Sequence, residues 1–274
     1  MIIDAHHHFW RYTPAEYNWI GPHMGILRRD YLPADLKREM DQAGVSQAIS
    51  VQARQSIEET RFLLTVAGQH DFLAGVVGWL PLTDPGFEKL LESFLSERKF
   101  KGLRHVIQDE GDDFFILRED FNRGVAALRN RVVYDILIFE RHLPQTIQFV
   151  DRHPDQVFVL DHLAKPRIRD GLLSPWRERL RELARRPQVY CKISGMATEA
   201  NWNRWTPAEL KPYFDIALEA FGPKRLMFGS DWPVLRLAGE YGAWVDTVRG
   251  WIGKLSAAEQ RWILEGTARE AYRL

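Results

Sequence analysis

The stretch that decides the fold is MIIDAHHHFW, at residues 1–10. Residues 2–5 are mostly apolar and form a short predicted strand, and His6 and His8 follow at its end. Because side chains alternate between the two faces of a strand, His6 and His8 point the same way and His7 points the opposite way. Two imidazoles on one face can share one metal ion or one substrate. The stretch therefore predicts a buried strand with chemistry at its carboxyl end.

Seven further apolar runs follow, separated by amphipathic helical stretches. All are rich in Val, Ile, Leu and Phe, as expected for strands that are buried on both faces. The eight predicted strands are residues 2–5, 47–53, 73–79, 102–106, 132–139, 157–160, 189–193 and 226–229. Three intervening helices begin with the spacing of a capping box, in which a Ser or Thr side chain and a Glu three residues later satisfy each other's backbone amides. The three pairs are Ser56 with Glu59, Thr206 with Glu209, and Ser256 with Glu259.

Eight strands that alternate with helices predict an α/β fold, a (β/α)8 TIM barrel, formed by residues 1–274 as a single domain. A doubly wound open sheet is the alternative. Such a sheet normally has fewer strands, and no G-x-G-x-x-G motif follows a predicted strand. The barrel is therefore the preferred interpretation.

Composition narrows the class of protein. The 37 basic residues balance the 37 acidic ones, so no global charge attracts nucleic acid or an anionic membrane. No apolar run is long enough to span a bilayer, and no signal-peptide pattern precedes the first strand. A single cysteine, Cys191, excludes an internal disulfide and a Cys-rich metal site. We expect a cytoplasmic enzyme with a small-molecule substrate; the sequence leaves its oligomeric state open.

Polar residues recur at the carboxyl ends of the predicted strands, where the active sites of such barrels lie. If the barrel forms, His6, His8, His162 and Asp231 converge. Three imidazoles and a carboxylate suit one divalent ion such as zinc, which would polarise a carbonyl and acidify a water molecule. Asp231 would be the general base that accepts a proton from the attacking water. This set predicts hydrolysis of a carbonyl compound.

Further residues at the same edge are candidates for catalysis and substrate binding. Arg104, His105 and Lys192 would stabilise a developing oxyanion or bind polar groups of the substrate, and His162 is a further catalytic candidate. Aromatic faces pack well against the C–H faces of sugars, and indole N–H groups can donate to hydroxyls. The predicted substrate contacts are Trp10, Gln52, Trp79, Lys165, Lys192, Trp202 and Trp232. The alternatives are that the tryptophans only seal loops, that Lys192 only pairs with a carboxylate, and that Asp4, which has the parity of His6 and His8, caps a loop.

Four segments resemble those of a known superfamily. The opening DAHHHFW (residues 4–10), DHLAKP (161–166), GSDWP (229–233) and GTAREAY (266–272) together resemble the amidohydrolase superfamily, in the branch called amidohydrolase 2. Within that branch the chain is similar to sugar lactonases that act on L-fucono- or L-rhamnonolactone. The resemblance covers essentially the whole chain, and it implies a distorted barrel that opens a cyclic ester by attack of water.

The resemblance also implies roles for individual residues. His6 and His8 match the histidine pair on the first strand, His162 matches the histidine after a central strand, and Asp231 matches the aspartate that accepts the proton. The two-metal members carry a carboxylated lysine on the fourth strand, where Arg104 and His105 stand here. One divalent metal is therefore expected at most, and in a metal-free version His6, His8, Arg104 and His162 would hold the carbonyl directly.

Two other functions stay open. A decarboxylase, or a hydrolase of a carboxylated lactone derived from an aromatic compound, would need a cationic clamp made by Arg54, Arg104 or Lys165. A non-enzymatic binding protein is the remote alternative, against which the joint presence of the histidines and Asp231 argues.

Overall fold

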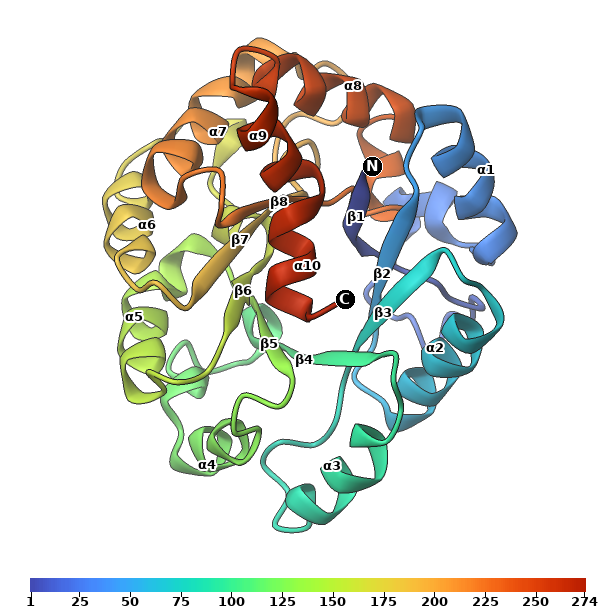
Figure 1. The fold of residues 1–274 in the computed structure, drawn as a ribbon, viewed down its shortest axis with the longest axis vertical. Helices are drawn as coiled ribbons and strands as arrows, with labels where there is room; N and C mark the ends of the chain where they lie inside the picture. Colours follow the sequence, from blue (N-terminus) through green and yellow to red (C-terminus); the bar gives the residue numbers. More distant parts are fainter.

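A computed structural model describes all 274 residues. Its core is one sheet of eight parallel strands that neighbour one another in chain order. They are β1 (Ile3–His7), β2 (Gln47–Val51), β3 (Leu73–Gly78), β4 (Phe100–Val106), β5 (Val133–Leu137), β6 (Phe158–Leu160), β7 (Val189–Ile193) and β8 (Leu226–Phe228). The strands form a ring with the helices outside it (Figure 1). The barrel prediction is confirmed, and the doubly wound sheet was the wrong alternative.

The ring closes between β1 and β8 only at the carboxyl ends of these strands. His7 and Trp232 form a parallel bridge. The His8 amide donates to the Trp232 carbonyl at 2.7 Å, and the Asp231 amide donates to the His6 carbonyl at 2.7 Å. The barrel is therefore distorted where β1 and β8 meet. The two hydrogen bonds hold the histidine segment beside Asp231.

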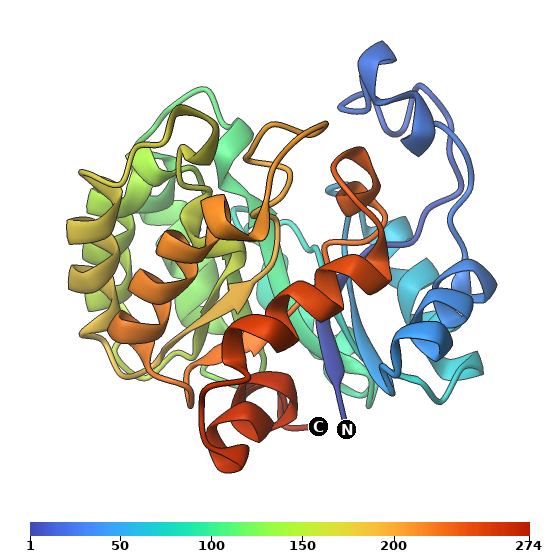
Figure 2. The ribbon, with the colours of Figure 1, turned by 90° about the horizontal axis from the view of Figure 1, so that it is seen from above.

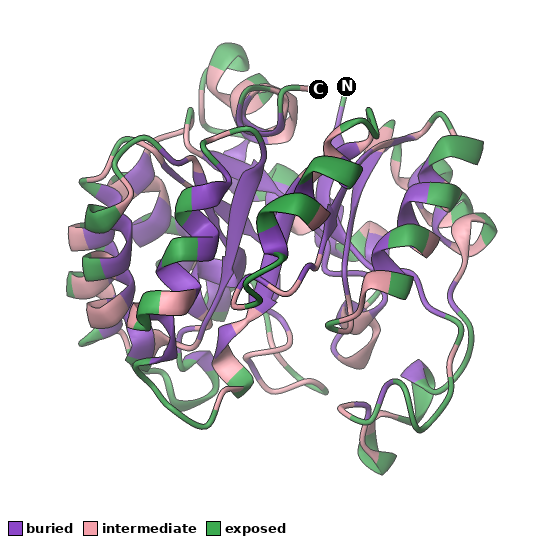
Figure 3. Ribbon diagram, turned by 90° about the horizontal axis from the view of Figure 1, so that it is seen from below, coloured by how far each residue is buried: buried purple, intermediate pink, exposed green.

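The helices cover the outside of the ring and turn their buried faces toward it (Figure 3). The main ones are α1 (Pro33–Ala43), α2 (Ile57–Gln69), α3 (Phe87–Leu95), α4 (Glu119–Ala127), α5 (Leu143–Arg152), α6 (Trp176–Ala184), α7 (Pro207–Phe221) and α8 (Tyr241–Ile252). Two shorter helices, α9 (Ala257–Arg261) and α10 (Thr267–Tyr272), end the chain. The predicted capping boxes at Thr206 and Ser256 are confirmed. At Ser56 only half of the box forms: its hydroxyl accepts from the Glu59 amide, but the Glu59 carboxylate accepts from the amides of Ala53 and Arg54 instead.

Short turns of 3-10 helix lie in the connections between strands and helices. They are η1 (Pro22–Leu27), η2 (Ile107–Asp109), η3 (Phe115–Leu117), η4 (Glu140–His142), η5 (Asp161–Ala164), η6 (Ile168–Asp170) and η7 (Val234–Leu237). A π-helical turn, η8 (Trp262–Gly266), joins α9 to α10. No helix is both long enough and apolar enough to cross a bilayer.

The C-terminal helix α10 plugs the amino-terminal end of the barrel and lies over the middle of the ring in Figure 1. Ala268, Ala271 and Tyr272 of α10 belong to one buried apolar cluster with inward-pointing strand residues. The strand members are Ile3, Ala5, Ile49, Val51, Val77, Val133, Val159 and Met227. This end of the interior is therefore filled by apolar packing, and only the opposite end is left for a site.

Two long connections rise from the carboxyl ends of the strands. One follows β1 and carries η1, and the other runs from β7 to α7; both project from the same side of the barrel (Figure 2). The rings of His23 and Trp202, one from each connection, stack at 5.9 Å. These connections therefore wall the mouth of the barrel on two sides.

Candidate active site

A β-bulge in β1 sets the direction of the histidines. The pairing of β1 with β2 shifts register between Asp4 and His7, so strict alternation fails there. His6 and His8 both reach Asp231, which confirms that they share a face. His7 points away and contacts the Ser50 hydroxyl at 3.1 Å.

Because of the same bulge, the prediction that Asp4 lies on the same face of the strand as His6 and His8 is wrong. This carboxylate lies on the other face of β1, where it accepts hydrogen bonds from the Tyr241 hydroxyl of α8, from the Ser230 amide and hydroxyl, and from the His6 amide. Asp4 thus joins β1 to the segment after β8, directly behind the cluster. Burial raises the pKa of its carboxyl to about 6.

Four predicted residues converge at the strand ends. The Asp231 Oδ1 atom lies 3.2 Å from His8 Nε2, 3.6 Å from His6 Nε2 and 3.9 Å from His162 Nε2. The two nitrogens of His6 and His8 are 3.2 Å apart. All four side chains are buried. One small ion or one polar group of a substrate can therefore touch all of them at once.

The outer nitrogen of each imidazole has a partner that fixes its orientation. His8 Nδ1 donates to the Val51 carbonyl at 2.8 Å. His6 Nδ1 lies 3.2 Å from an Asp161 oxygen, and His162 Nδ1 lies 2.8 Å from the Ser194 hydroxyl. A carbonyl only accepts, so Nδ1 of His8 carries the hydrogen and its Nε2 presents a lone pair to the centre. His6 Nδ1 lies between the Asp161 carboxylate and the Lys192 ammonium, at 3.2 Å from each, and these two contacts hold the ring in place.

Burial keeps the imidazoles of His6 and His162 neutral. It lowers the pKa of His6 well below its ordinary value and lowers that of His162 to about 4. Burial alone would raise the pKa of Asp231, but the surrounding imidazoles, led by His162, bring it below the ordinary value. The cluster therefore offers nitrogen lone pairs and an ionised carboxylate at neutral pH.

A buried chain of charges lies directly beneath the cluster. Asp161 is 2.9 Å from Arg104 and 3.0 Å from the Lys192 ammonium, which in turn is 2.5 Å from Asp135. The Tyr272 hydroxyl of α10 donates to Asp135 at 2.8 Å. Arg104 also lies 3.4 Å from His6 Nε2. Two cations therefore occupy the floor of the site, and they hold Asp161 ionised with a pKa well below its usual range, against the effect of burial.

The backbone around the site adopts conformations that side chains normally avoid. His162, Leu163, Ala164 and Lys165 all have positive φ, between 50° and 60°. Asp231 also has a φ of 62°. Left-handed conformations of non-glycine residues cost energy and occur often at functional sites. Here they aim His162 and Asp231 at the same point.

Gly195, with a φ of 67°, leaves the room that the His162 ring needs. A Cβ at this position would come within 2.7 Å of that ring. A larger residue would therefore displace His162 from the cluster.

Several predicted residues lie away from the centre. Adjacent residues of β4 face opposite sides, so Arg104 points inward, whereas His105 points outward, stacks on Phe115 and contacts Glu110 at 2.6 Å. We therefore withdraw the catalytic interpretation of His105. Lys192 is fully buried in the floor, so it pairs with carboxylates there and does not reach a substrate.

Two of the predicted tryptophan contacts are core residues. Trp10 and Trp232 are fully buried, and both pack edge-to-face on Tyr31. Gln52 is also buried, and its amide donates to the Arg104 carbonyl at 3.2 Å. These three residues follow β1, β2 and β8 and are buried, so they support the site from behind.

The remaining predicted contacts are partly exposed. Trp79 donates its indole N–H to His105 at 3.2 Å, and Trp202 donates its own to the Thr198 carbonyl at 2.8 Å. Both rings can therefore offer a face, but not an N–H group, to a ligand. Lys165 lies 3.9 Å from Glu199, which follows β7.

Five residues that shape the site are absent from the predicted catalytic, metal-binding and substrate-binding residues. They are Asp135, Asp161, Ser194, Glu199 and Tyr272. For Asp135 and Asp161 a signal existed: a carboxylate within or just after an apolar strand must find a buried cation, and Arg104 and Lys192 stand on strands of the same barrel. Glu199 begins the segment 199–205, which follows the seventh predicted strand and which the sequence indicates as a candidate specificity loop. Tyr272 carries no such signal, because its place depends on how α10 folds back.

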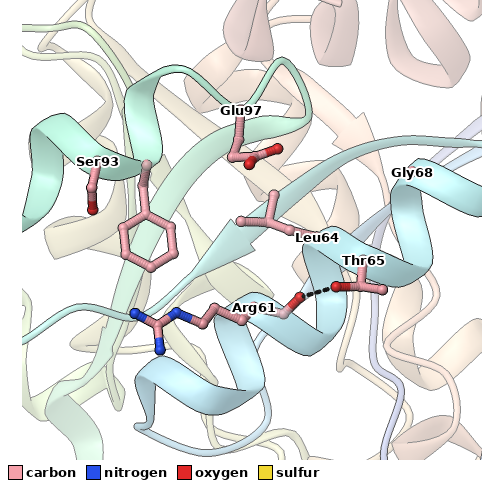
Figure 4. A pocket seen from close by; sticks show the side chains of 7 residues that line it. Arg61, Leu64, Thr65, Gly68, Ser93 and Glu97 are labelled. Carbon is pink, nitrogen blue, oxygen red and sulfur yellow. Dashed lines mark hydrogen bonds between the residues drawn. The ribbon is translucent and has the colours of Figure 1, made fainter.

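A surface groove of about 630 Å³ between α2 and α3 lies elsewhere. Figure 4 shows its lining, which comes from the two helices and from Glu97 after α3. The lining residues are Arg61, Leu64, Thr65, Gly68, Ser93, Phe94 and Glu97. None of them belongs to the cluster, so the mouth of the barrel remains the candidate site.

Comparison with known proteins agrees with this geometry. The family model described as amidohydrolase (amidohydrolase 2) matches residues 3–274. A protein named L-fucono-1,5-lactonase from Burkholderia multivorans is 45% identical over 286 residues, which cover 100% of this chain and 96% of that protein. Another protein of that name, from Burkholderia ambifaria, is 38% identical and covers 89% of this chain and 85% of its own length.

A solved structure is also similar along the whole chain. A crystal structure of an amidohydrolase from Burkholderia multivorans with bound zinc superposes with a TM-score of 0.95 at 46% identity, covering 100% of this chain and 99% of that one. The family model spans nearly the whole chain, and the Burkholderia multivorans relative covers all of it; this chain therefore belongs to the amidohydrolase family.

Proposed function

We propose that this protein is a lactonase that opens a neutral, polyhydroxylated sugar lactone such as L-fucono-1,5-lactone. The observation that carries the proposal is the convergence of His6, His8, His162 and Asp231 within 3.9 Å at the barrel mouth. The two relatives named L-fucono-1,5-lactonase, at 45% and 38% identity, support the same reaction class.

In the proposed reaction Asp231 is the general base. Its carboxylate is ionised, faces the centre and has no lysine or arginine within ion-pair distance. A water molecule beside Oδ1 would pass its proton to this oxygen as it attacks the ester carbon. The proton can then go to the ring oxygen that leaves as an alcohol. Arg104, 3.4 Å from His6 Nε2, adds a fixed positive charge near the carbonyl oxygen that becomes negative.

The donor set fits one divalent metal. The facing nitrogens of His6 and His8 and the Asp231 oxygen lie 3.2–3.6 Å from one another, so one cation placed between them can accept a lone pair from each. We propose that these three residues, with His162, would hold one ion, and zinc suits imidazole and carboxylate ligands. Bound there, it would polarise the ester carbonyl and acidify water. The zinc-bound relative supports this choice.

The ion pairs of the site favour a neutral substrate over a carboxylated one. A carboxylated lactone needs a cation that is free to bind it. Two of the cations predicted for such a clamp are already paired, since Arg54 lies 2.7 Å from Glu16 and Arg104 lies 2.9 Å from Asp161. The third, Lys165, faces the Glu199 carboxylate at 3.9 Å, and the negative charge of Glu199 opposes a carboxylated ligand there. The decarboxylase and the hydrolase of a carboxylated lactone are therefore the weaker candidates.

A panel of substrates tests the proposal. Hydrolysis of L-fucono-1,5-lactone, L-rhamnono-1,4-lactone and a dicarboxylated pyrone is followed by proton release, and CO2 release is followed for a dihydroxybenzoate. We expect kcat/KM to be highest for a sugar lactone, by at least about 100-fold over the pyrone. Hydrolysis of the pyrone alone, or CO2 release alone, would contradict the proposal. Binding of a sugar lactone without turnover would favour a binding protein.

Metal binding is tested by stoichiometry and affinity, apart from activity. Chelator-treated protein should take up one zinc per chain, measured by competition with a chromophoric chelator. His8→Ala should weaken the affinity at least about tenfold, and His7→Ala, whose ring points away from the centre, serves as the matched control. Equal affinity in the two variants would contradict the assigned ligand set.

A further inference from the structure

We propose that Lys165 and Glu199 form a hydroxyl-recognition site at the mouth of the barrel, which binds one hydroxyl group of the lactone between the ammonium and the carboxylate. The inference rests on the proposed lactonase function and deepens it, because it names the group of the substrate that is recognised and the residues that recognise it.

Both residues are placed by the segments that position His162. Lys165 follows it by three residues in the left-handed turn, and the Lys165 amide donates to the His162 carbonyl at 2.7 Å. Glu199 follows β7 and lies five residues after Ser194, whose hydroxyl contacts the His162 ring. The two side chains therefore approach each other from adjacent strand ends beside the cluster.

The pair is open in a way that the buried ion pairs in the floor of the site are not. The Lys165 ammonium and the nearest Glu199 oxygen are 3.9 Å apart, too far for a hydrogen bond. The pairs in the floor of the site lie at 2.5–3.0 Å. Neither the Lys165 ammonium nor the Glu199 carboxylate makes a hydrogen bond to any other protein group, so both keep free hydrogen-bonding capacity.

A hydroxyl group satisfies this arrangement better than a charged group does. An ammonium only donates and an ionised carboxylate only accepts, whereas a hydroxyl does both. The Lys165 and Glu199 side chains are 18% and 25% exposed, so a ligand can reach them, yet most of their surface is shielded from water. A carboxylate placed here would meet repulsion from Glu199. The pair therefore selects for sugars and against acids.

Electrostatics place Glu199 close to the reacting groups. Burial raises the pKa of its carboxyl, the Lys165 ammonium lowers it, and the negative charge of Asp231 raises it. Lys165 in turn is one of the charges that lower the pKa of His162. Because Lys165 lies in the same turn as His162 and Glu199 follows Ser194, which contacts the His162 ring, a lactone held at His162 and Asp231 would direct its ring hydroxyls toward the pair.

The test compares two substrates that differ only in hydroxyl groups: a polyhydroxylated 1,5-lactone and unsubstituted δ-valerolactone. The variants are Glu199→Gln and Lys165→Met. The matched control is Lys211→Met, which removes the lysine of an exposed pair with Asp215. We expect each site variant to lower kcat/KM for the sugar lactone about 10- to 100-fold, mainly through KM, since hydrogen bonds to charged groups are worth about 1.5–3 kcal/mol.

Activity on δ-valerolactone should change less than about twofold in the same variants, because this substrate has no hydroxyl to lose. Lys211→Met should leave both activities unchanged. An equal loss on both lactones would show that the pair only supports the fold of the mouth and would overturn the proposal. No loss on either lactone would overturn it as well.

Binding of a polyhydroxylated 1,5-lactam, an analogue that resists hydrolysis, separates this proposal from the lactonase function. If the wild-type protein binds the lactam and Glu199→Gln binds it at least about tenfold more weakly by calorimetry, hydroxyl recognition holds even if no lactone is hydrolysed. Equal lactam affinity in the two proteins would overturn hydroxyl recognition even in an active lactonase. No binding to wild type would overturn it too.

Discussion

The two halves of the barrel interior differ sharply in chemistry. The half toward α10 is an apolar cluster of eleven residues, among them Ile3, Val51 and Met227. The half toward the mouth holds buried histidines, aspartates, Arg104 and Lys192. Apolar burial stabilises a fold with few geometric demands, whereas buried charges cost free energy unless each one is paired. We infer that the apolar half stabilises the fold, whereas the charged half costs stability and serves the reaction.

Removal of the central cation of the charged half should have the largest effect on stability. Lys192→Met would leave Asp135 and Asp161 without the ammonium that lies 2.5 and 3.0 Å from them. We expect the free energy of unfolding to fall by about 3–5 kcal/mol, measured by urea denaturation. The double variant Lys192→Met, Asp135→Asn should recover part of that loss, because one carboxylate is then neutral. A loss below about 1 kcal/mol for the single variant would contradict a dry, paired floor.

A truncation in the apolar half should separate stability from activity. Met227→Ala removes a fully buried side chain from the apolar cluster. It should lower the free energy of unfolding by about 2–4 kcal/mol while kcat at 25 °C stays within about twofold of wild type. The measurement pairs urea denaturation with initial rates. A loss of kcat as large as that of a mouth variant would show that the two halves are not functionally distinct.

A smaller loss of stability is expected for a substitution at Tyr272, where the apolar and charged halves of the interior meet. Tyr272 packs in the apolar cluster and donates its hydroxyl to Asp135. Tyr272→Phe keeps the ring and removes one donor to a buried carboxylate, so the free energy of unfolding should fall by about 1–2 kcal/mol. Tyr190→Phe, which loses an exposed bond to Glu270, is the control and should change stability by less than about 0.5 kcal/mol. Equal effects in both variants would argue against a special role for the Asp135 contact.

The fold and the central residues of the site can be predicted from the sequence. The eight strands, the barrel and the convergence of His6, His8, His162 and Asp231 follow from apolar runs and from the rule that strand ends meet at one edge. These features depend on local periodicity and on topology, which the sequence displays directly.

The face on which a given side chain lies was less predictable, because a shift of one residue in strand register reverses it. The bulge in β1 placed Asp4 opposite to its expected face, and β4 turned His105 outward while Arg104 points inward. Trp10 and Trp232 were expected to contact substrate because they fall at predicted strand ends. They are buried because Tyr31, from the connection after β1, packs against both rings.

The most direct test of the central claim compares wild type with Asp231→Asn on L-fucono-1,5-lactone. The exchange is nearly isosteric and removes the proposed base. Thermal unfolding of both proteins serves as the check that the fold is intact. We predict that wild type hydrolyses the lactone and that kcat falls by about 10²- to 10⁴-fold in the variant, the usual contribution of a general base. A folded Asp231→Asn protein with wild-type kcat would contradict the role of the strand-end cluster in the reaction.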